Sequence, residues 1–64
     1  MEYPRYFVVD FDIYVRLEKR GDDILGFNLY DSPYPVRKAI AEGEEITKEE
    51  YDKATKPLLE QAEP

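Results

Sequence analysis

The amino-acid sequence predicts an α+β protein: an antiparallel β-hairpin or three-stranded sheet with one or two short helices packed on one face. Apolar residues alternate with a period of two over residues 6–18 and again over 24–31, and a glycine-containing turn separates the two stretches. A helix-capping pattern begins at Thr47. A chain of 64 residues has room for one small domain, with the hairpin over about 5–31 and a helical region over about 33–62.

The first strand is predicted over residues 6–18, where β-branched and aromatic side chains dominate. One of its faces is wholly apolar, so we expect that face to form the core together with the second strand and the helices. Truncation of Phe11 to alanine should then cost about 3 to 5 kcal/mol. The expected core consists of Phe7, Val9, Phe11, Ile13, Val15, Leu17, Leu25, Phe27 and Leu29, packed against Val36, Ile40, Tyr51 and Leu58.

Residues 19–23 are predicted to form the turn, in which Gly21 can take the positive φ that tight hairpin loops need. The second arm is shorter than the first, so residues 6–10 have no hairpin partner and would present an open strand edge. Either residues 44–46 return as a third short strand, or the same strand of a second copy pairs there. We favour the internal strand, because a dimer held by one strand edge buries little area. The chain is expected to be a monomer or a weak homodimer.

A short helix is predicted after the sheet, with Asp31 or Ser32 as its cap and Pro33 at its first position. It should run to residue 42 and end at Gly43.

The last helix carries the clearer start signal. Thr47 and Glu50 have the spacing of a capping box, in which each side chain bonds the other residue's backbone amide. Pro57 is expected to kink this helix or to end it near Thr55, because proline lacks the amide hydrogen that the helix needs.

The composition excludes several classes of function. The chain contains neither cysteine nor histidine, which removes disulfides, thiolate and imidazole ligands, cysteine nucleophiles and the usual general base. We therefore expect no enzyme activity and no cofactor. A formal net charge of −6 argues against direct binding of nucleic acid and favours basic partners. No apolar run is long enough for a membrane span, and we expect a cytoplasmic protein.

Asp10 and Asp12 place two carboxylates on one face of the predicted strand. Such a pair could begin a Mg²⁺ or Mn²⁺ site. The simpler interpretation is that both lie on the solvent face, where charges discourage edge pairing.

The other face of the predicted strands is mixed, with Tyr6, Tyr14, Arg16 and Tyr30 among its members. Tyrosine and arginine are enriched at recognition surfaces. This face is either a docking surface or the place where tyrosines and a helix simply cover the sheet.

Acidic residues gather around the start of the last helix, and Glu44, Glu45 and Glu49 are the candidate partner-binding members. A basic protein could bind them, although acidic residues are also ordinary in the first turn of a helix.

The leading hypothesis is a small non-catalytic protein-interaction or regulatory module that docks through its tyrosine-bearing face or a strand edge. The alternative is an acidic inhibitor or nucleic-acid mimic that occupies a basic groove of a partner protein. A divalent-metal enzyme using Asp10 and Asp12 is the reading that the sequence favours least.

Overall fold

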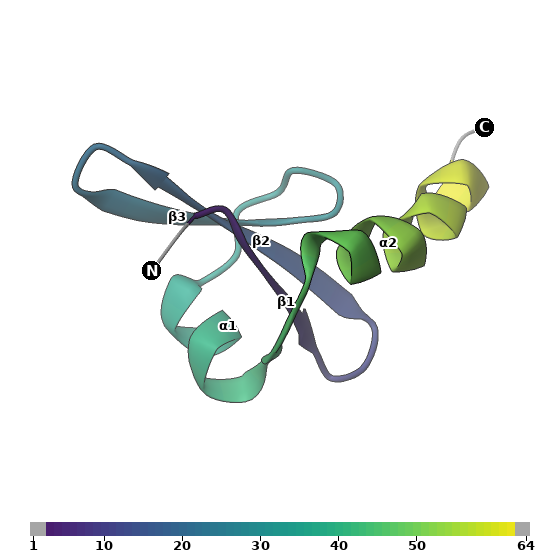
Figure 1. The fold of residues 1–64 in the computed structure, drawn as a ribbon, viewed down its shortest axis with the longest axis horizontal. Coiled ribbons are helices and arrows are strands. Elements are labelled where there is room, and N and C mark those ends of the chain that lie inside the picture. The colour runs from purple at the N-terminus through teal and green to yellow at the C-terminus, as the bar shows by residue number, and fades with distance from the viewer. Residues whose placement is uncertain (1–2, 63–64) are drawn as a thin grey trace.

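The computed structural model describes residues 3–62 and has a four-stranded antiparallel sheet with two helices packed on it (Figure 1), which confirms the predicted α+β arrangement. The strands lie in the order β3-β2-β1-β4. The elements are β1 (Arg5–Val9), β2 (Ile13–Arg20), β3 (Asp23–Asn28), α1 (Val36–Glu42), β4 (Glu44–Ile46) and α2 (Lys48–Ala62).

The long first strand of the prediction is in fact two strands joined by a tight loop. Asp10 and Phe11 have φ angles of 51° and 69°, so the chain reverses there and Val9 pairs with Ile13. The single-strand prediction was wrong because a three-residue loop leaves the alternation of apolar residues unchanged. Residues 9 and 13 lie on the same face of the sheet in a continuous strand and also when the chain folds back between them.

The core lies on one face of the sheet and is smaller than predicted. Phe7, Val9, Val15 and Leu17 are buried against Ala39 of α1. Partly buried side chains surround this cluster: Tyr3, Ile13, Ile24, Tyr34 and Val36.

Four residues predicted for the core face of the sheet lie elsewhere. Phe11 is 96% exposed at the loop tip, so its assignment to the core was wrong. Residues that pair directly lie on the same face of a sheet, and the core residue Leu17 pairs with Gly26. The neighbours of Gly26, Leu25 and Phe27, therefore lie on the face opposite the core. Leu29 follows the end of β3.

The predicted return of residues 44–46 to the sheet is confirmed. Tyr6 pairs with Ile46, and Val8 pairs with Glu44. β1 also pairs with β2, so it has a strand on each side within one chain. The expectation that residues 6–10 have no hairpin partner was wrong, because the chain reverses at residues 10–12.

α1 begins at Val36, after Pro35, and not at Pro33 as predicted. Pro33 instead forms a bridge with Phe27, since the segment before α1 pairs with the edge of β3. The Tyr34 N–H donates to the Gly26 carbonyl at 2.9 Å, and a side chain at Gly26 would collide with the Tyr34 carbonyl oxygen.

The end of α1 at Gly43 is as predicted, and the Gly43 N–H donates to the Ala39 carbonyl at 2.9 Å. Ile40, expected in the core, is 50% exposed. Ala39 occupies the buried position instead.

α2 begins with the predicted capping box. The Glu50 N–H donates to Thr47 Oγ1 at 3.0 Å, and the Thr47 N–H donates to a Glu50 carboxylate oxygen at 3.1 Å. Pro57 lies inside the helix, so the predicted end near Thr55 was wrong. One missing hydrogen bond does not end a helix whose neighbouring turns keep theirs. Neither described helix is long and apolar enough to cross a membrane.

The two helices contact opposite faces of the sheet. Phe7 points toward α1, whereas the ring of its neighbour Tyr6 lies 4.7 Å from that of Tyr51 in α2, measured between centroids. The expectation that Tyr51 packs on the same face as the core was therefore wrong. In Figure 1 α2 extends away from the sheet toward the C-terminus.

Candidate functional site

The tyrosines of the mixed face do not present one common surface. Tyr6 is 8% exposed beneath α2, and Tyr14 is half-buried with its ring edge-on to Tyr51 at 6.1 Å. These rings join the sheet to α2. Only Tyr30, in the loop after β3 and 58% exposed, is open to a partner among the three predicted tyrosines.

Arg16 is half-buried and holds two carboxylates. Its Nε lies 2.6 Å from Glu18, and its Nη2 lies 3.0 Å from Asp31. Its guanidinium also lies 5.6 Å from the ring centre of Phe27. Burial opposes the charge of Arg16, but the hydrogen bonds that it donates to Asp31 and Glu18 raise its pKa. The side chain ties the loop after β3 to β2, and its Nε and Nη2 donors are already in use.

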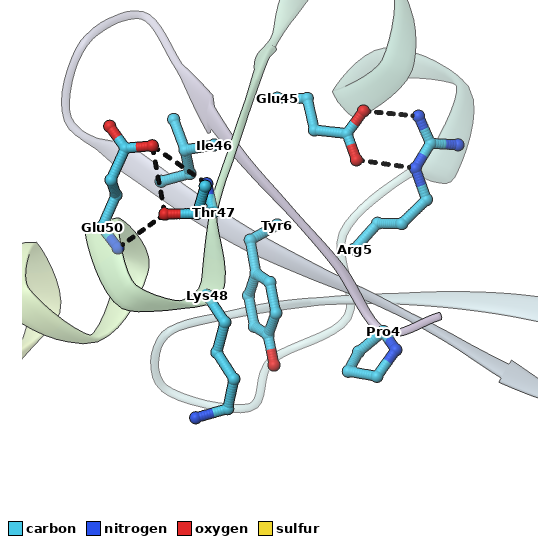
Figure 2. Close-up of a pocket in the computed structure, with 8 residues that line it drawn as sticks. All are labelled: Pro4, Arg5, Tyr6, Glu45, Ile46, Thr47, Lys48 and Glu50. Atoms are coloured by element: carbon cyan, nitrogen blue, oxygen red, sulfur yellow. Dashed lines mark hydrogen bonds and ion pairs between the residues drawn. The ribbon is translucent and has the colours of Figure 1, made fainter. Parts of the chain in front are cut away.

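Glu45 lines a pocket of about 490 Å³ between β1, β4 and the start of α2. Figure 2 shows that Arg5 and Glu45 bind each other in this pocket and that Glu50 bonds to Thr47. Both oxygens of Glu45 accept from Arg5, at 2.8 and 3.0 Å, and the Thr47–Glu50 capping box forms the opposite wall. The hydrogen bond from Arg5 lowers the pKa of Glu45. The pocket is therefore a structural junction between two strands and a helix.

The acidic residues around the start of α2 are partly neutralised within the chain. Lys48 pairs with Asp52 at 2.8 Å, and Glu45 and Glu50 are engaged as described above. Glu44 and Glu49 are exposed, and neither belongs to an ion pair found among residues 3–62.

Phe11 is the exposed residue that sequence reasoning missed. It is a large apolar side chain, 96% exposed, on a backbone with φ of 69°. Bulky residues rarely adopt this left-handed conformation, because Cβ crowds the following carbonyl. The two flanking aspartates were the available signal, since Asp tolerates turns and left-handed geometry better than most residues.

Phe11 also lines a groove of about 270 Å³ between the β1–β2 loop and the junction of α1 with β4. The groove is lined by Val8, Asp10, Phe11, Glu42, Gly43 and Glu44. Phe11 and the three carboxylates of Asp10, Glu42 and Glu44 are called the acidic tip below. The structure thus places Glu44, a predicted site residue, in the same groove as Phe11, which was predicted to lie in the core.

Asp10 and Asp12 lie in the loop and not side by side on a strand, which corrects the placement expected for them. Within residues 3–62, no group of three or more Asp, Glu, His or Cys is arranged to hold a metal ion.

Comparison with known proteins adds no relative: no protein-family model, no curated protein and no solved structure matches this chain.

Proposed function

We propose that this protein is a small non-catalytic interaction module that docks on a partner protein through the acidic tip, with Phe11 as the anchor. The observation that carries the proposal is the exposure of the Phe11 ring, 96%. An exposed ring adds nothing to the core, and its left-handed backbone costs about 1–2 kcal/mol. Aromatic side chains are also typical anchors of protein interfaces.

The other surfaces considered from the sequence support docking less well. α2 covers the part of the tyrosine-bearing face around Tyr6 and Tyr14, whose rings contact Tyr51. The outer edge of β3 is covered where residues 32–34 pair with it, because Asn28 N–H donates to the Ser32 carbonyl at 2.8 Å. The edge strand β4 has three residues, two of them glutamates. Short charged edges resist the addition of a further strand.

The alternative of an acidic inhibitor that fills a basic groove with the carboxylates near α2 has weaker support. Glu45, Glu50 and Asp52 already bind groups of the same chain. The absence of catalysis and the cytoplasmic location remain predictions from the sequence.

The experiment uses the immobilised protein and two variants as baits in an extract of the source cell. Phe11→Ala removes the anchor, and Leu59→Ala is the matched control, since Leu59 is an exposed apolar residue on α2. We expect at least one protein that is retained by the parent and by Leu59→Ala but lost with Phe11→Ala. If all three baits retain the same proteins, Phe11 is not the anchor.

A further inference from the structure

The carboxylates around Phe11 identify the kind of partner that its ring would enter. Asp10, Glu42 and Glu44 line the same groove as the ring. We infer that the partner is a protein with an apolar pocket rimmed by lysine or arginine, which takes up Phe11 while its rim pairs with these three carboxylates. This inference rests on the proposed function.

The three carboxylates of the acidic tip are available for such pairing. The ion pairs found among residues 3–62 use other carboxylates, those of Glu18, Asp31, Glu45 and Asp52. Three unpaired negative charges beside one groove make the local electrostatic potential more negative. Lysine or arginine at the rim of a partner's pocket would reduce the repulsion among these carboxylates and would be attracted to them.

The same charges decide against other occupants. Nucleic acid is a polyanion, and its approach to a chain of net charge −6 is unfavourable. A symmetric dimer through the tip would bring two sets of carboxylates together without a cation between them. Contact of the tip with exposed basic residues of a second copy, such as Arg37 and Lys38, is a separate outcome that the sedimentation measurement below detects.

The electrostatic part of the interaction should appear mainly in the association rate. Complementary charges steer two proteins together, and salt screens this attraction, whereas the burial of a ring depends little on salt. The contributions of Phe11 and of the carboxylates can therefore be separated by measurement.

The first step of the test places the photoreactive residue p-benzoyl-phenylalanine at position 11 and cross-links the bait in the same extract. The cross-linked protein is identified, the attached peptide is mapped, and the partner is purified. We expect the attachment site to lie in an apolar pocket with lysine or arginine at its rim. A rim without these residues overturns the inference.

The second step measures association with that purified partner between low and high salt. The tip variant is Asp10→Asn with Glu42→Gln and Glu44→Gln. The control is Asp22→Asn with Asp23→Asn and Glu60→Gln, which changes the net charge equally but at exposed positions outside the tip. At low salt we expect the tip variant to associate at least about tenfold more slowly, with a flatter salt dependence, and the control to change by less than about threefold.

The outcomes separate the inference from the proposed function. If the tip variant behaves like the control while Phe11→Ala abolishes binding, the basic rim is wrong and the anchor stands. If no protein depends on Phe11, the proposed function fails and the inference fails with it. If the captured protein is this chain itself, confirmed by sedimentation, a second copy is the occupant and the inference is overturned.

Discussion

Phe11 combines an exposed side chain with a left-handed backbone, so its replacement should not weaken the fold. We predict that Phe11→Asn raises the free energy of unfolding by about 1 kcal/mol, because Asn adopts this conformation with less strain and no buried contact is lost. Urea unfolding measures the change. Phe7→Ala is the control, since Phe7 is 3% exposed and its truncation should cost about 3–5 kcal/mol. A comparable loss for Phe11→Asn would show that the ring is buried.

Gly26 shows the opposite case, in which the absence of a side chain permits close packing. A Cβ at this position would collide with the Tyr34 carbonyl oxygen and crowd Leu17. We predict that Gly26→Ala costs about 1–3 kcal/mol and speeds hydrogen exchange of the Tyr34 amide, which donates to Gly26. Gly21→Asn is the control, because Gly21 has a φ of 62° and open space around it. Equal protection of the Tyr34 amide in parent and Gly26→Ala would contradict this.

At the scale of the elements, β4 depends on an ion pair that responds to pH. The hydrogen bond from Arg5 lowers the pKa of Glu45 from its ordinary value of 4.5. The pKa of Glu45 is lower in the folded than in the unfolded chain, so the ion pair stabilises the fold at pH values above the unfolded pKa. This stabilisation is lost as the pH falls through the folded pKa. The Glu45 side chain is about half exposed to solvent, so the contribution is small.

We therefore predict that Glu45→Gln is less stable than the parent at about pH 7 and that the difference shrinks as the pH falls below about 4.5. Urea unfolding at a series of pH values measures it. Glu44→Gln serves as the control, since Glu44 lies on the same strand without an ion pair among the described residues. A difference that stays constant down to about pH 3 would show that Glu45 acts through packing and not through its charge.

At the scale of the whole molecule, the two helices contribute unequally. α1 packs on the core through Ala39, whereas α2 meets the other face with only Tyr51 and Thr55 buried among its residues up to Gln61. An isolated helix of 15 residues is marginal in water. The attachment of α2 therefore depends on a few side chains.

Tyr51→Ala should release α2 while the sheet stays folded, because Tyr51 holds the contacts with Tyr6 and Tyr14. Hydrogen exchange measures this: α2 amides should lose protection, and those of β1 and β2 should keep it. Leu17→Ala is the contrast, since this fully buried residue should destabilise all elements together by about 2–5 kcal/mol. Loss of protection throughout the chain in Tyr51→Ala would show that the fold is one cooperative unit.

The sequence by itself determined the features that depend on local chemistry. Alternation predicted the sheet, and the Thr47–Glu50 spacing predicted the start of α2. The return of residues 44–46 was the favoured of two ways to cover an edge of residues 6–10, although these residues also pair with β2. Each of these follows from the period of a strand, the geometry of a cap or the need to pair backbone groups.

Only the tertiary structure decided which residues of neighbouring strands share a face of the sheet, because the length of each turn sets which residues pair. The loop at residues 10–12 preserves the parity of the alternation, so the sequence could not distinguish it from a continuous strand and placed Phe11 in the core. The turn between Arg20 and Asp23 has two residues, which pairs odd positions of β2 with even positions of β3 and moves Leu25 and Phe27 to the other face. The acidic tip was hidden for the same reason, since Phe11 meets Glu42 and Glu44 only after the chain reverses and β4 returns beside β1.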